Sequence, residues 1–368
     1  MKLIVAVTVS LLTVSACASV KSAADSHPAK PSRTTTSATS ATHSPSPKAS
    51  SKASSRRSGN KRGTGSKRGT HHPSPVTSSP PHHRRTILTS YPRVNRPCKG
   101  QIPEPFAGIA ANGDFGAKVS AFRSYAGSHL RLVEFYNPFP GPFNAREAGQ
   151  IVHMHELPLI QLNPRNISMA KLAAGAYDRS IRTYARQVKA FGCHVVLSLG
   201  HEMNGWWYHW GLPDTSPHAF KTAWRHFFNI FAAEHVTNVI RSWDPSHEHV
   251  RYRGGKNAWP ASMWFPGNKY VDWIGIDGYF MPGQSFDKVL SFQLQNIRRV
   301  THKPIYLAET GVADSSIQGR QIAGLFRGIW RWHLAGLVWF DQNRRAAWTL
   351  GGKPAKDAAF RRAVSRFP

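Results

Sequence analysis

The chain has 368 residues, of which 40% are hydrophobic, which excludes a wholly disordered protein and allows one large domain or two modest ones. Its formal net charge is +29 at pH 7. Residues 1–95 carry 15 Lys and Arg against one acidic residue, and the remainder carries 33 against 18, so a basic tail alone does not explain the charge. Such a surface favours polyanions, among them anionic cell-wall polymer, acidic lipid headgroups and nucleic acid.

Residues 1–17 have the layout of a secretory signal. Lys2 precedes an apolar run over residues 3–14 that is too short to span a membrane. The run ends in Val14-Ser15-Ala16-Cys17, which resembles the lipobox of bacterial lipoproteins. This resemblance implies cleavage and lipidation at Cys17, the alternative being an ordinary signal peptide. We expect an exported protein that is lipid-anchored to the outer face of the cell membrane, or otherwise secreted.

Residues 18–95 are mostly Ser, Thr, Pro, Lys, Arg and His, with almost no apolar side chain to bury. Such a composition cannot offset the entropy lost on ordering, so we expect a disordered basic linker. Its cations are suited to an anionic cell wall or membrane surface. The predicted organisation is therefore a signal over 1–17, a linker over 18–95 and a folded domain over 96–368.

Short apolar runs alternate with amphipathic segments after Pro97, a pattern typical of parallel sheets covered by helices. The predicted strands are 106–110, 130–135, 157–162, 195–199, 238–243, 271–276, 304–308 and 336–340. The clearest helices are 174–191, 217–235, 286–300 and 318–331. Eight repeats over about 270 residues predict an α/β fold, a (β/α)8 TIM barrel preceded by the disordered linker.

Two glutamates come directly after predicted strands. Glu202 follows the fourth strand and Glu309 the seventh, and these strands face each other across a barrel mouth, where barrel enzymes place their chemistry. Two carboxylates that converge there are the arrangement of glycoside hydrolysis. Trp206, Trp207, Tyr208 and Trp210 would offer flat faces for sugar rings. The alternative is that these aromatic side chains pack at the rim or in the core and that Glu202 forms a salt bridge.

His201-Glu202-Met203-Asn204-Gly205, followed by Trp207-Tyr208 and Trp210, resembles the acid/base segment of glycoside hydrolase family 26, mostly endo-β-mannanases. The resemblance continues to the strand-six segment ending at Tyr279, to Glu309 and to Trp339. It implies that Glu202 is the acid/base and Glu309 the nucleophile of a retaining hydrolase, with the two carboxyl groups about 5 to 5.5 Å apart. It also implies a set of substrate-binding residues: His201, Asn204, Trp207, Trp210, Tyr279 and Trp339.

Two departures from the family pattern concern the substrate. Ser198 stands where the family usually has Arg, and Leu162-Asn163-Pro164 stands where Trp-Glu-Pro is common. The catalytic pair is intact, so we expect cleavage of a β-linked polysaccharide. The first candidate activity is that of an endo-β-1,4-mannanase. A β-glucanase or xylanase on the same scaffold and a non-catalytic cell-surface glycan-binding barrel are the alternatives.

Other patterns predict little further chemistry. His153-Met154-His155-Glu156 would split across two strand faces, so we expect no metal and no cofactor. Cys98 and Cys193 remain if Cys17 is acylated, and in an exported domain they form either a disulfide or two buried thiols. Export makes nucleic acid an unsuitable partner, so none is expected, and we expect a monomer.

Overall fold

The computed structural model describes residues 105–111, 115–127, 130–248, 259–351 and 353–367. Cys17, Cys98 and the predicted linker lie outside these ranges. The described residues form a closed barrel of eight parallel strands in sequence order, with β1 paired to β8. The strands are β1 (Phe106–Ala110), β2 (Leu130–Phe139), β3 (Leu157–Pro164), β4 (Val195–Leu199), β5 (Val239–Trp243), β6 (Trp273–Phe280), β7 (Ile305–Val312) and β8 (Gly336–Phe340). The predicted (β/α)8 fold is confirmed.

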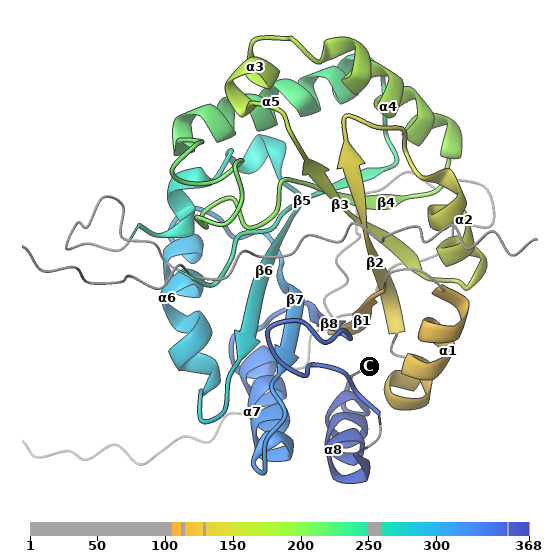
Figure 1. The fold of residues 1–368 in the computed structure, drawn as a ribbon, viewed down its shortest axis with the longest axis vertical. Coiled ribbons are helices and arrows are strands. Elements are labelled where there is room, and N and C mark those ends of the chain that lie inside the picture. Colours follow the sequence, from red (N-terminus) through yellow and green to blue (C-terminus); the bar gives the residue numbers. More distant parts are fainter. Residues whose placement is uncertain (1–104, 112–114, 128–129, 249–258, 352, 368) are drawn as a thin grey trace, which may run out of the picture. The chain divides into compact units, whose positions relative to one another are not determined.

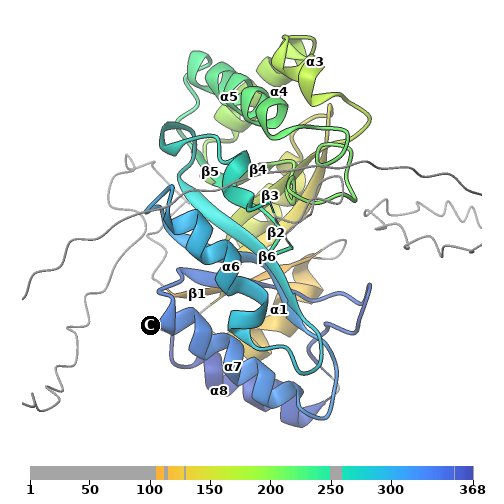
Figure 2. The same cartoon turned by 90° about the vertical axis from the view of Figure 1, so that its left-hand side faces the viewer.

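Helices surround the strands (Figure 1). They are α1 (Phe115–Ala126), α2 (Ala145–His153), α3 (Met169–Ala173), α4 (Asp178–Phe191), α5 (Pro217–Ala233), α6 (Phe286–Arg298), α7 (Gln318–Arg331) and α8 (Pro354–Val364), with the short 3-10 helices η3 (Ala261–Trp264) and η4 (Asn268–Tyr270). The cluster of α3, α4 and α5 lies on the opposite side of the barrel from α7 and α8 (Figure 2). None of the helices in the described ranges is long and apolar enough to cross a membrane.

The strands bury both of their faces, which is why their sequences are almost continuously apolar. Inside the barrel, Phe106 packs against Trp273 and Tyr306, with ring centroids 6.1 and 5.7 Å from that of Phe106. The outward faces pack against the helices in a second, larger apolar cluster. The barrel interior is therefore filled by aromatic rings, and it is not a pore.

Several predicted boundaries differ from the structure at the carboxyl ends of strands. β2, β3, β6 and β7 run two to four residues beyond the predicted ends. Glu309 consequently lies within β7 instead of directly after it. The extra residues include polar ones, which a search for apolar runs leaves out. Helix α4 starts later than predicted because the chain turns at Gly175, where φ is +87°, after the separate helix α3.

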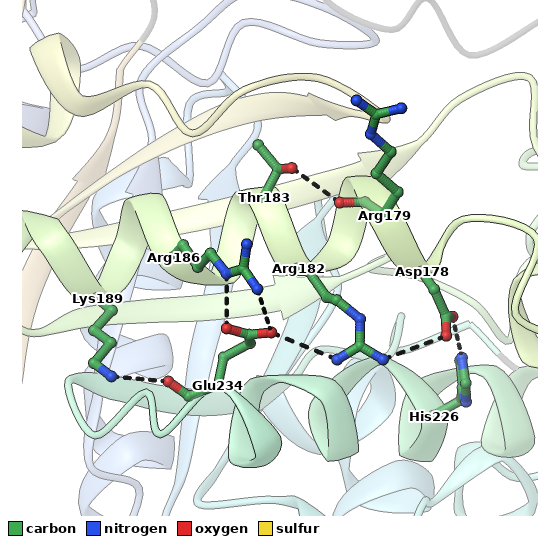
Figure 3. Close-up of polar contacts among 8 residues, drawn as sticks. All are labelled: Asp178, Arg179, Arg182, Thr183, Arg186, Lys189, His226 and Glu234. Atoms are coloured by element: carbon green, nitrogen blue, oxygen red, sulfur yellow. Dashed lines mark hydrogen bonds and ion pairs between the residues drawn. The ribbon is translucent and has the colours of Figure 1, made fainter.

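Ion pairs join α4 to α5 (Figure 3). Arg186 donates two hydrogen bonds to the Glu234 carboxylate, at 2.8 and 3.2 Å, and Arg182 donates a third at 3.5 Å. The Arg186 hydrogen bonds lower the pKa of Glu234. Asp178 at the start of α4 lies 2.6 Å from Nε2 of His226. Glu234, directly after α5, thus pairs with two arginines of α4.

Candidate active site

Glu202 and Glu309 both line one cavity of about 240 Å³ at the carboxyl ends of the strands. Glu202 lies in the turn after β4, and Glu309 lies in β7. They are 6% and 5% exposed, so both carboxyl groups are largely removed from water. The backbone φ of Glu202 is +54°, in the left-handed region that non-glycine residues rarely adopt, and strain of this kind concentrates at functional sites.

The Glu309 carboxylate accepts hydrogen bonds from two phenols. Tyr136 on β2 donates to Oε1 at 2.6 Å, and Tyr279 on β6 donates to Oε2 at 2.5 Å. Nε2 of His201 lies 4.0 Å from Oε1. Burial raises the pKa of Glu309, while the tyrosine hydrogen bonds act in the opposite direction because they stabilise the charged form. The carboxylate is held in a fixed orientation that exposes it to the cavity.

The Glu202 carboxyl accepts a hydrogen bond from the indole N–H of Trp207, at 2.7 Å. Burial, followed by the negative charge of Glu309, raises the pKa of Glu202 to about 8. The Trp207 ring can lie this close because residue 205 is glycine, where a Cβ atom would approach the indole to 2.5 Å. Glu202 is therefore a proton donor at neutral pH, and Glu309 has more hydrogen bonds to stabilise its ionised form.

Three further acids lie wholly buried beneath the pair. They are Glu134 on β2, Asp244 directly after β5 and Asp277 on β6. Burial raises the pKa of each one, to about 6 for Asp244. Gln161 donates to Asp244 at 3.0 Å, and the Ser242 hydroxyl also donates to it. The negative charge of Glu309 raises the pKa of all three, so the five acids titrate as a coupled group.

Several residues of the cavity wall were not predicted from the sequence. Besides Tyr136, they are Ser246, His247, Glu248, Met281, Gln284, Phe340, Gln342, Arg344, Arg345 and Trp348. Most of them lie on loops, which lack the repeating apolar pattern that locates strands and helices in the sequence. Tyr136 did carry a signal, because it lies two residues after Glu134, a charge inside an otherwise apolar strand, and strand residues two apart share a face.

Of the predicted substrate-binding residues, His201, Trp207 and Tyr279 line the cavity. Asn204, Trp210 and Trp339 do not line it and are at most 1% exposed. This prediction needs correction, because these three side chains lie outside the cavity wall that a bound glycan would contact.

The three buried residues hold the site from below. The amide of Asn204 bonds the main chain of Ser246 and Glu248. The indole N–H of Trp210 donates to the carbonyl of His201 at 2.8 Å, and that of Trp339 donates to the carbonyl of Trp348 at 2.9 Å. Each residue therefore fixes the backbone of a cavity-lining residue.

In the ranges that the structure covers, no group of three or more His, Cys, Asp or Glu side chains is arranged to hold a metal ion. His153 contacts the carbonyl of Gly149, and Glu156 pairs with Arg123. Cys193 is disulfide-bonded. Its partner lies outside the described residues, so the pairing with Cys98 stays a prediction.

The chain is similar to one family model and to several curated proteins. A family model described as glycosyl hydrolase family 26 matches residues 168–346. Endoglucanase H of Acetivibrio thermocellus is 27% identical over 263 residues, which cover 67% of this chain and 29% of that protein. Mannan endo-1,4-beta-mannosidase A and B of Caldalkalibacillus mannanilyticus is 26% identical over 175 residues, which cover 43% of this chain and 31% of that protein. The chain thus spans under a third of the length of these curated relatives.

Solved structures resemble the barrel. A double mutant of the Cellulomonas fimi endo-beta-1,4-mannanase superposes with a TM-score of 0.55 at 16% identity, covering 72% of this chain and 71% of that one. A family 26 beta-mannanase from Bacteroides ovatus superposes with a TM-score of 0.52 at 18% identity, covering 72% and 88%. At these identities the likeness shows the fold.

Proposed function

From the premise that this chain carries a glycoside hydrolase family 26 domain, we propose that it is a retaining hydrolase of β-linked polysaccharide, with endo-β-1,4-mannan as the first candidate substrate. The observation that carries the proposal is the asymmetry of the two carboxyl groups in one cavity. Glu202 has its pKa raised to about 8, and Glu309 accepts hydrogen bonds from two tyrosines.

The proposed mechanism uses each glutamate twice. Glu309 attacks the anomeric carbon while Glu202 gives its proton to the leaving oxygen, which forms a covalent glycosyl-enzyme. Glu202, now ionised, takes a proton from water, and this water breaks the bond to Glu309 with net retention of configuration. Tyr136 and Tyr279 orient the nucleophile, and the N–H of Trp207 stabilises Glu202 once it is ionised.

We infer the sugar backbone of the substrate from the activity that is most common in the family and from the names of the relatives. One curated relative is named a mannosidase, one an endoglucanase and one, from Vibrio sp, a beta-1,3-xylanase. Ser198 and Asn163, which depart from the family pattern, are both buried within the barrel wall. A β-glucan or a xylan is accordingly the alternative to mannan.

The test is to incubate the purified protein with β-mannans, xylans and β-glucans and to measure new reducing ends. Glu309→Ala should remove turnover on every polymer. Glu202→Ala should keep partial activity on an aryl glycoside whose leaving group needs no proton, and azide should restore rate by replacing water. Cleavage by Glu309→Ala at the wild-type rate would contradict the assignment.

We further propose that the protein is exported and lipid-anchored through Cys17, with residues 18–95 as a basic linker toward an anionic wall or membrane surface and 96–368 as the catalytic domain. The Val14-Ser15-Ala16-Cys17 sequence and the linker composition support this. Cys17→Ser should move the protein from the membrane fraction to the soluble fraction. A Cys17→Ser protein that fractionates as wild type does would exclude the anchor.

A further inference from the structure

The loop after β8 brings two positive charges to the cavity. Arg344 and Arg345 both line it, and both residues are exposed. The loop is braced, because Asn343 and Ala347 form an antiparallel bridge and the N–H of Arg344 donates to the carbonyl of Ala346 at 3.2 Å. Adjacent arginines on a braced turn place two guanidinium groups at the wall of the cavity.

The pair lies close to the two glutamates. The guanidinium of Arg345 is 5.9 Å from the ring centre of Trp207, the residue that donates to Glu202. The charge of Arg345 lowers the pKa of Glu202, and that of Arg344 lowers the pKa of Glu309. An occupant of the cavity that contacts these glutamates therefore lies within electrostatic reach of both arginines.

The two arginines in the cavity wall favour a charged substrate over a neutral one. A neutral glycan offers hydroxyl groups, which other side chains of the wall, such as Gln284 and Gln342, can bind without a charge. An anionic glycan, in contrast, meets the negative charge of Glu309, whose ionised form two tyrosines stabilise, and nearby cations offset that repulsion. Among the described residues, the Arg345 guanidinium contacts the Trp207 ring and forms no ion pair. Its charge is therefore available to an incoming anion.

We propose that the polysaccharide bound in this cavity carries an anionic group, either the carboxylate of a uronic acid or a phosphate ester, and that Arg344 and Arg345 bind this group. The inference rests on the proposed hydrolase function and narrows its substrate class. Guanidinium groups match both anions through paired hydrogen bonds. The net charge of +29 adds a general attraction toward such a polymer.

The test measures binding of the polymer, so its result does not depend on whether the protein cleaves that polymer. The Glu309→Gln protein is run in native gels that contain galactomannan or mixed-linkage β-glucan. Each polymer is used unmodified, with part of its C6 hydroxyls oxidised to carboxylates, and with part of them phosphorylated. We expect about tenfold tighter binding to a charged form, decreasing as salt is added. Preference for the oxidised form identifies a uronic acid, and preference for the phosphorylated form identifies a phosphate ester.

Arginine variants assign the preference to the cavity. Arg344→Gln with Arg345→Gln should lower the ratio of charged to neutral affinity to the smaller preference that the net charge of the chain gives by itself. Arg361→Gln with Arg362→Gln removes the same charge from an exposed pair on α8 that does not line the cavity, and it should keep the ratio. Equal binding of all polymer forms, or a preference that the cavity substitutions leave unchanged, would overturn the proposal. If the hydrolase itself is wrong, the wild-type protein yields no reducing ends whatever these ratios are.

Discussion

The indole N–H of Trp207 sets the balance of charge on Glu202. It stabilises the ionised carboxylate and so lowers a pKa that burial raises to about 8. Trp207→Phe removes the donor, and we expect the alkaline limb of the pH profile of kcat/KM to move up by about one unit. Trp206→Phe is the matched control, because that indole is 45% exposed and is not among the cavity-lining residues. An alkaline limb that stays in place in Trp207→Phe would exclude this role.

Tyr136 should act on the other limb. Its phenol donates to Oε1 of Glu309 and favours the ionised form, so Tyr136→Phe should raise the pKa of Glu309. The acidic limb of kcat/KM should then move to higher pH, and kcat should decrease by about tenfold. Tyr125→Phe on α1 removes a phenol outside the cavity and serves as control. A loss of kcat without movement of the acidic limb would mean that Tyr136 acts only on packing.

Glu202 and Glu309 could be predicted because each lies near the carboxyl end of an apolar strand, where a barrel puts its chemistry. Asp244 also stands directly after a strand, β5, so the same rule identifies it, whereas the rule does not identify Glu134. Glu134 lies inside a strand, and a single acid in an apolar run is as compatible with a strand edge as with a coupled group. Trp207 lines the cavity whereas Trp210 is buried, and the amino-acid sequence does not show which of these two indoles is exposed.

At the scale of elements, the buried amide of Asn204 ties the loop after β4 to the loop after β5. It donates to the carbonyls of Ser246 and Glu248 at 2.9 and 2.8 Å and accepts from the N–H of Ser246 at 2.8 Å. Asn204→Ala leaves these buried groups without partners, so we expect the free energy of unfolding to fall by about 3 kcal/mol. Chemical denaturation measures this change.

The control for this prediction is Asn296→Ala on α6. That amide donates one local hydrogen bond, to the carbonyl of Phe292 at 2.7 Å, so its loss should cost about 1 kcal/mol or less. Because Ser246 and Glu248 line the cavity, Asn204→Ala should also weaken glycan binding, whereas Asn296→Ala should not. Equal stability of the two variants would show that the loops are held by other contacts.

The strand and helix order was predictable because buried parallel strands read as apolar runs and covering helices as amphipathic ones. The same reasoning placed β1, β4, β8 and α7 at their observed bounds. It failed at the carboxyl ends of β2 and β7, where Tyr136 and Glu309 continue a strand with polar side chains. Those strand ends form the site, so the residues that serve the function are also the ones at which the predicted strand boundaries were wrong.

At the scale of the whole molecule, the five buried acids make folding sensitive to pH. The folded chain holds the proton of Glu202 up to a pH of about 8, whereas the unfolded chain releases it near the ordinary value of 4.5. Between these values the folded state binds more protons, so the free energy of unfolding decreases as pH rises from about 4.5 to about 8. The same direction holds for Asp244, whose pKa is raised to about 6.

Glu202→Gln tests this linkage, because glutamine keeps the shape of the side chain and has no proton to release. We expect its Tm to exceed that of the wild type at pH 8 and the difference to shrink steadily as pH falls through 4.5, below which wild-type Glu202 is protonated in both states. Asp214→Asn, at an exposed residue, should show no such trend. A difference in Tm that is constant across this pH range would mean that Glu202 is ionised in the folded protein at neutral pH. It would then remove the acid from the proposed mechanism, since a carboxylate without its proton cannot assist the leaving group.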